Sequence, residues 1–172
     1  MTIEPDTKDW TWVLNEACPE CGFDAAKVDH SMLAHLVRVN AVGWLSVLAR
    51  DDATVRPSEN VWSPLEYACH VRDVHRVFVE RVQLMLKEDD PQFANWDQDQ
   101  TAIEADYASQ DPATVAEELV EAAEIIAEEY AAVTADQWRR PGTRSNGSRF
   151  TVDSLGRYHL HDAVHHLHDV RG

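Results

Sequence analysis

The chain is poor in basic residues, has few cysteines and lacks a long apolar run. Its 15 Lys and Arg stand against 31 Asp and Glu, and the formal net charge of -16 disfavours binding to nucleic acids and anionic membranes. Three cysteines, an odd number, argue against a disulfide framework. No apolar run approaches the length of a membrane span, and the N-terminus around Glu4 and Asp6 does not resemble a signal peptide. We therefore expect a cytoplasmic protein that binds neither nucleic acid nor membrane.

The sequence also lacks internal repeats, low-complexity tracts and domain linkers, so we expect one domain over residues 1–172. A chain of 172 residues is long enough to bury a proper core. Four amphipathic segments of roughly 20 residues, with a long connection between the second and the third, are typical of an all-α four-helix bundle with a crossover. We expect residues 1–24 to form an N-terminal extension and residues 25–172 to form the bundle.

Capping signals indicate where the helices begin. Ser63, Pro64 and Glu66 form a compact start signal, because serine caps the first turn, proline fits the first helical position and glutamate completes a capping box. Asp24 is a suitable cap for the first helix, and Asp111 precedes the third. The expected helices are residues 25–50, residues 64–87, a segment from 112 onward, and the C-terminal segment, which Thr151 or Asp153 can cap.

The C-terminal segment concentrates the side chains that bind metals. Five of the nine histidines lie between residues 159 and 168, with one aspartate among them and a second directly after them. On a helix, Asp162 stacks with His166 and His161 with His165, so either pair could hold a metal ion. The first pair lies with His159 on a flank of the apolar stripe and reaches the interior, whereas the second pair points toward solvent. We therefore expect Asp162 and His166 to coordinate, and His161 and His165 not to.

Four residues elsewhere are candidates for a site, each with a plainer alternative. His70 lies beside the apolar face of the second helix, either as a boundary histidine or as a metal ligand. Asn40 lies near the middle of the apolar face of the first helix, where it either ties helices together or lines a polar pocket. Trp96, in the long connection, and Arg144, in an arginine-rich loop, could touch a ligand, or could belong to solvated loops.

The N-terminal extension contains the pair Cys18 and Cys21, in the order Cys-Pro-Glu-Cys-Gly. This spacing resembles half of a zinc knuckle, but structural zinc needs four ligands and no second cysteine pair follows. A redox role is no better supported, because no βαβ pattern surrounds the motif. We interpret the pair as a reduced loop anchor, and its role stays open.

Residues 62–73, Trp-Ser-Pro-Leu-Glu-Tyr-Ala-Cys-His-Val-Arg-Asp, together with the histidine-rich residues 161–169, resemble the DinB-like superfamily. That superfamily includes mycothiol-dependent maleylpyruvate isomerase and other mycothiol or bacillithiol S-transferases. The resemblance implies a four-helix bundle that binds a divalent metal, zinc or nickel. The implied ligands are His70, Asp162 and His166, with Asp162 standing where relatives carry Glu or His. Asp169, one turn further on, would orient a ligand from the second shell.

The resemblance implies a metal-dependent thiol S-transferase or a thiol-cofactor-dependent isomerase acting on a small electrophile. Two imidazoles and one carboxylate leave a coordination position open, and a thiol bound there would lose its proton. We expect one ion per chain and a low-molecular-weight thiol as co-substrate. The alternatives are a non-enzymatic, stress-related metal-binding bundle, a non-haem iron enzyme, and polar boundary residues that bind no metal. The sequence leaves open whether the chain forms a homodimer.

Overall fold

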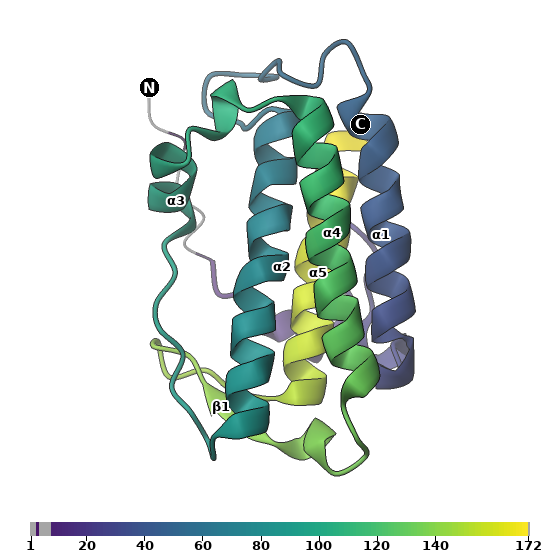
Figure 1. Ribbon diagram of the computed structural model, residues 1–172, viewed down its shortest axis with the longest axis vertical. Coiled ribbons are helices and arrows are strands. Elements are labelled where there is room, and N and C mark those ends of the chain that lie inside the picture. The colour runs from purple at the N-terminus through teal and green to yellow at the C-terminus, as the bar shows by residue number, and fades with distance from the viewer. Residues whose placement is uncertain (1–2, 4–7, 172) are drawn as a thin grey trace.

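The computed structural model describes residue 3 and residues 8–171, so Glu4 and Asp6 lie outside the described residues. In this part of the chain, four long helices form a bundle (Figure 1). α4 and α5 each pack against both α1 and α2. The predicted all-α four-helix bundle is confirmed. The four helices are α1 (Leu33–Leu48), α2 (Pro64–Lys87), α4 (Pro112–Ala132) and α5 (Val152–Arg171).

The long connection between α2 and α4 carries the chain back along the bundle, so that these two helices run in the same direction (Figure 1). It contains a short helix, α3 (Gln98–Glu104), where the sequence pattern predicts no regular structure. The carboxylate of Asp97 caps α3, accepting hydrogen bonds from the backbone N–H groups of Asp99 at 3.1 Å and Gln100 at 3.0 Å. The crossover is confirmed, and it includes one local helix that the sequence analysis did not predict.

The helix starts follow the capping signals with one exception. Ser63 and Glu66 form the expected capping box at the start of α2. The first helix, however, begins at Leu33 rather than near residue 25. The preceding residues form two short 3-10 helices, Ala25–Lys27 and His30–Met32, because Asp24 and Asp29 bond to the backbone N–H groups two residues ahead and interrupt the α-helix.

The arginine-rich loop before α5 is also more ordered than expected. It contains an antiparallel hairpin of β1 (Pro141–Thr143) and β2 (Arg149–Thr151), in which Gly142 pairs with Phe150. Thr151 then caps α5, because its hydroxyl accepts a hydrogen bond from the backbone N–H of Ser154 at 3.1 Å. The hairpin thus fixes the start of the helix that carries the histidines.

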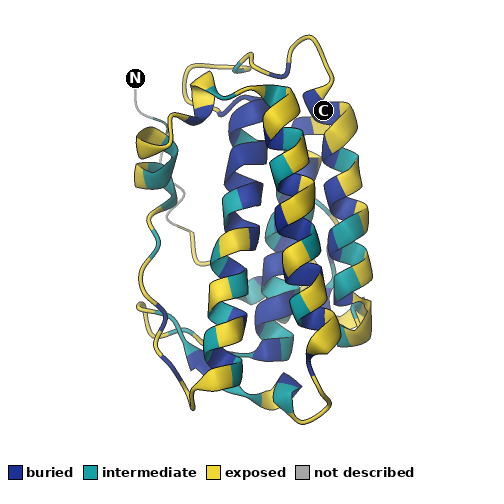
Figure 2. Ribbon diagram, viewed as in Figure 1, coloured by how far each residue is buried: buried dark blue, intermediate teal, exposed yellow. Residues whose placement is uncertain are grey.

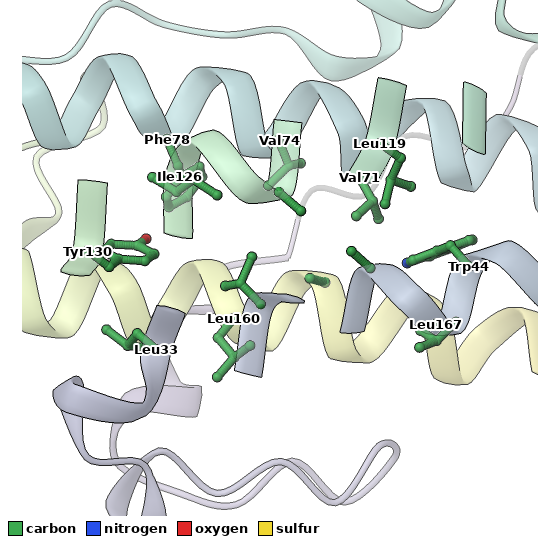
Figure 3. Packing of buried hydrophobic residues seen from close by; sticks show 14 of the residues in the cluster. Leu33, Trp44, Val71, Val74, Phe78, Leu119, Ile126, Tyr130, Leu160 and Leu167 are labelled. Atoms are coloured by element: carbon green, nitrogen blue, oxygen red, sulfur yellow. The ribbon is translucent and has the colours of Figure 1, made fainter. Parts of the chain in front are cut away.

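The hydrophobic core lies between the four long helices (Figure 3). Trp44 of α1, Phe78 of α2, Ile126 of α4 and Leu160 of α5 are all buried in it. Within the four long helices, the exposed residues lie on the surfaces that face away from this core (Figure 2). The core therefore fixes the rotation of α2 and α5 about their axes, and with it the direction of their polar side chains.

Residues 30–48 form a helical stretch that is long and apolar enough, by length and composition alone, to cross a membrane. This differs from the expectation that no apolar run reaches that length. A core helix of a bundle meets the same criterion, and Leu33, Val37 and Trp44 of this stretch are fully buried against the rest of the chain. In the structure it is therefore the first helix of the bundle.

Candidate metal centre

His70 of α2 and the pair Asp162 and His166 of α5 converge on one point, which we call the His70 site. The Nε2 atom of His70 lies 3.6 Å from Oδ1 of Asp162, and Nε2 of His166 lies 3.7 Å from the same oxygen. The three ligand atoms all lie within 4.8 Å of one another. Ligands bound about 2.0–2.2 Å from a tetrahedral zinc ion are roughly 3.4 Å apart. The three side chains thus need only small rotations to hold an ion.

Three polar atoms of His70 and Asp162 are buried without a hydrogen-bond partner among the described residues. They are the two ring nitrogens of His70 and Oδ1 of Asp162, whose approaches to one another and to His166 are longer than hydrogen bonds. Leaving such atoms unpaired costs about 1–3 kcal/mol each, so a group that binds them is expected. A metal ion would satisfy Nε2 of His70 and Oδ1 of Asp162 together, and the donor set therefore fits a divalent ion.

The electrostatics of the site give the protonation states that metal ligands need. Burial lowers the pKa of His70, so its imidazole is neutral near pH 7. Burial opposes the ionisation of Asp162, but the neighbouring His166 and His70 outweigh it and hold the pKa of Asp162 well below its ordinary value. The site therefore combines a neutral imidazole with a carboxylate, as a catalytic zinc site does.

The site opens on one side into a cavity of about 390 Å³. Asp162 and His166 line this cavity, whereas His70 is only 1% exposed and lies behind them. The ring of His70 is held between Trp96, stacked on it at 5.6 Å between ring centroids, and Trp62, at 5.4 Å. One side of a bound ion would thus be shielded by aromatic rings while the other faces the cavity.

Asp169 lies beside His166, where its carboxylate can orient the imidazole. Its Oδ2 atom lies 3.2 Å from Nδ1 of His166, the ring nitrogen that points away from Asp162. A carboxylate in this position orients the imidazole and makes it a stronger ligand. The sequence resemblance predicts this role for Asp169.

The remaining predicted pocket residues differ in where the structure places them. Arg144 lines the cavity and donates a hydrogen bond to the hydroxyl of Tyr158 at 3.2 Å. Trp96 contacts the site through the His70 ring rather than through the cavity wall. Asn40 is a tie between helices: its side-chain amide donates to the carbonyl of Ala163 at 3.0 Å. Asn40 is not among the residues that line the cavity, so its placement favours the tie between helices over the pocket.

His159 is fully buried, and it binds protein rather than facing the cavity. Its Nε2 lies 2.8 Å from Nδ1 of His75, and its Nδ1 lies 2.9 Å from the hydroxyl of Tyr130. Burial lowers the pKa of His159 to about 4, so the ring is neutral near pH 7. Both ring nitrogens of His159 thus have partners in the core, and His159 is not among the residues that line the cavity, so its role beside the metal site stays a prediction.

The second pair on α5 gave the largest difference from the sequence analysis. His161 and His165 are buried, 3% and 7% exposed, rather than directed to solvent. The N-terminal segment covers them, and it brings Cys18 and Cys21 to the same place. The ligand atoms of these four residues lie within 4.8 Å of one another. We call this cluster the Cys18 site.

A short 3-10 helix, Thr11–Leu14, packs the N-terminal segment against α5 (Figure 1). The ring of Trp10 lies 4.9 Å from that of His165 and 5.6 Å from that of His161, measured between centroids. The apolar stripe of α5 predicts which face meets the bundle core, but it cannot show that a separate segment covers the opposite flank. A signal was nevertheless present, since Cys-x2-Cys and His-x3-His are both spacings of zinc-binding pairs.

Residues 33–170 match the DinB superfamily. Because the match spans most of the chain, this protein belongs to the DinB superfamily. No curated protein matches it. A similar solved structure is YfiT from Bacillus subtilis, described as a probable metal-dependent hydrolase with an unusual four-helix bundle topology. That likeness has a TM-score of 0.69 and 17% sequence identity, over 98% of this chain and 91% of that chain. At this identity it shows the shared fold.

Proposed function

We propose that the protein is a metal-dependent enzyme whose open coordination position takes a small cellular thiol and delivers it to a small electrophile. His70, Asp162 and His166 would hold the ion, zinc in the first instance and nickel as the alternative. The observation that carries this proposal is the pair of buried, unpartnered atoms, Nε2 of His70 and Oδ1 of Asp162, that converge with His166 beside a cavity. Such a thiol-dependent reaction suits the cytoplasm, where thiols are kept reduced.

A bound divalent ion would supply Lewis acidity and lower the pKa of a coordinated thiol toward neutrality. The protein's own residues provide the rest. Asp162 would contribute one negative charge to a bound divalent ion and the two imidazoles none, so this ligand set would leave a net positive charge that favours a thiolate over a thiol. Arg144 in the cavity wall can orient a carboxylate of the thiol or of the electrophile through bidentate hydrogen bonds.

The position of the chain's own cysteines supports an external thiol. Cys69 neighbours His70 in sequence but is fully buried, and its sulfur donates to the side chain of Gln110 at 3.5 Å. Cys18 and Cys21 lie together at the Cys18 site rather than at the His70 site. The nucleophile of a thiol transfer would therefore have to be brought in by a co-substrate.

Hydrolysis by a metal-bound water is the second candidate, because a water molecule could occupy the same open position as a thiol. The similar structure YfiT, described as a probable metal-dependent hydrolase, favours it. The two reactions differ in whether turnover requires an added thiol. An iron-dependent oxygenase would require ferrous iron and oxygen, and a non-enzymatic bundle would turn over neither class of substrate.

The test is to titrate cobalt-substituted protein with mycothiol, bacillithiol, glutathione and a simple thiol. The wild-type protein is used, and its spectrum before thiol addition is subtracted, so that its own cysteines do not contribute to the change. We expect a sulfur-to-cobalt charge-transfer band and thiol-dependent consumption of a test electrophile, both lost in His166→Ala and both kept in His168→Ala, a control at an exposed position of the same helix. An unchanged cobalt spectrum with every thiol would overturn the thiol proposal. Metal-dependent, thiol-independent cleavage of an ester or amide would then establish the hydrolase.

A further inference from the structure

We propose that Cys18, Cys21, His161 and His165 form a second, structural zinc site that fastens the N-terminal segment to α5. This inference does not depend on the reaction proposed for the His70 site. It starts from the geometry of four side chains contributed by two parts of the chain. Sγ of Cys18 lies 3.7 Å from Nδ1 of His165, and all four ligand atoms fall within 4.8 Å of one another.

The turn between the two cysteines has the geometry that presents both sulfurs to one side. The backbone N–H of Gly22 donates to the carbonyl of Cys18 at 2.9 Å, and the N–H of Cys18 donates to the carbonyl of Phe23 at 2.7 Å. Gly22 has a φ of 76°, in the left-handed region where a side chain would be strained. These hydrogen bonds close the turn that carries the two cysteines. The conformation of the turn is therefore defined by its own backbone.

A buried polar atom at the Cys18 site points to a missing partner. His161 is 3% exposed, and its Nε2 atom has no hydrogen-bond partner within the described ranges. The rings of Trp10 and Phe23 lie 5.6 Å and 5.5 Å from that of His161, so its immediate surroundings are largely aromatic. Aromatic rings cannot accept the lone pair of that nitrogen. A metal ion bound to Cys18 could accept it as a coordination bond.

The donor set selects zinc and predicts a structural role. Two thiolates balance the charge of a divalent zinc ion, and two neutral imidazoles add none, so the buried complex is neutral. Binding would release two thiol protons to solvent, with no change of oxidation state. Four protein ligands fill a tetrahedral shell and leave no position for a substrate. The His70 site, in contrast, has three ligands and a cavity beside it.

Carboxylates that could orient a zinc ligand also lie beside the Cys18 site. Nδ1 of His165 faces Cys18, while Nε2 of the same ring lies 3.6 Å from a carboxylate oxygen of Glu20 and 3.7 Å from Oδ1 of Asp169. A histidine that binds zinc through one nitrogen usually offers the other to a carboxylate. Asp169 thus stands between the two sites, with Oδ1 toward His165 and Oδ2 toward His166.

A zinc ion at the Cys18 site would stabilise one wall of the cavity. Trp10 and Glu20, on either side of the covering 3-10 helix, line the cavity beside the His70 site. A zinc ion bound by residues of both the N-terminal segment and α5 would link the two directly and hold this wall in place. Loss of the zinc should therefore loosen residues 10–23 without unfolding the bundle.

The test is metal analysis and cobalt spectroscopy of reduced protein purified without a histidine tag. We expect two zinc ions per chain in the wild type and one in the double variant Cys18→Ser/Cys21→Ser, with Cys69→Ser as the matched cysteine control that keeps both. Cobalt-loaded wild type should show a sulfur-to-cobalt band without any added thiol. The band should remain in His70→Ala and disappear in the double variant.

Hydrogen exchange provides a readout that does not depend on activity. In the double variant, protection of residues 10–23 should fall while that of α2 and α4 stays unchanged. A wild-type protein with reduced cysteines that shows no sulfur-to-cobalt band would overturn the proposal, whether or not any variant folds. Zinc content that is the same in wild type and double variant would also overturn it.

Discussion

Two neighbouring pairs on α5 face different surroundings. Asp162 and His166 meet His70 of α2, and they line a cavity. His161 and His165, one residue earlier and rotated by about 100°, meet two cysteines of the N-terminal segment. The first set has three candidate ligands, one of which is a carboxylate. The second set has four candidate ligands and no carboxylate. If both proposals hold, α5 carries a reactive and a structural metal site side by side, because different segments cover its two flanks.

The largest expected effect is that of His70→Ala, which should separate the sites. Removing a direct ligand should weaken metal binding at the His70 site by more than the roughly 10–100-fold that changes of outer-shell residues cause. Metal-dependent turnover should fall accordingly, while the second zinc remains. Metal content and activity measured on the same sample provide the check. Full occupancy of two metals in His70→Ala would show that this residue is not a ligand.

The two i,i+4 pairs can be separated by changing adjacent histidines. His166→Ala should lose the ion of the His70 site and keep the sulfur-to-cobalt band of the Cys18 site. His165→Ala should do the reverse, because its ring points toward Cys18. Parallel cobalt spectra of both variants make the measurement. Loss of both ions in each variant would mean that the two clusters are one site, and would remove the distinction.

Asp169→Asn should have a smaller effect, a loss of metal affinity at both sites. The carboxylate of Asp169 approaches His165 and His166 through its two oxygens, and an amide would orient both rings less strongly. We expect affinity for each ion to fall by roughly 10–100-fold. Competition with a chelator of known affinity measures the two constants. A change confined to one ion would show that Asp169 supports only that site.

The smallest effect is expected at His159, which bonds to His75 and Tyr130 and which we interpret as not binding a metal. Tyr130→Phe removes the hydroxyl that bonds to His159 and should lower the free energy of unfolding by about 1–3 kcal/mol. Metal content should not change, because His159 binds His75 and Tyr130 instead of an ion. Urea unfolding and metal analysis of the variant are the two measurements. Altered zinc content would connect this cluster to the metal sites.

The sequence was sufficient for the bundle, the crossover and the capping of α2, because helix periodicity and capping residues act locally. It also predicted that His70, Asp162 and His166 come together, since both helices turn these residues toward the same region of the bundle. It failed for His161 and His165, because their burial depends on a segment about 140 residues away. It left Asn40 undecided, because an amide on a buried helix face suits a tie between helices as well as a pocket.

The most direct test of two distinct sites on α5 is an anomalous difference map, recorded at the zinc absorption edge from crystals of tag-free, reduced protein. We predict two peaks per chain. One should lie among His70, Asp162 and His166, with density for a non-protein ligand on its cavity side. The other should lie among Cys18, Cys21, His161 and His165, with four protein ligands. A single peak bound by residues of both clusters, or no peak at the Cys18 site, would contradict this account.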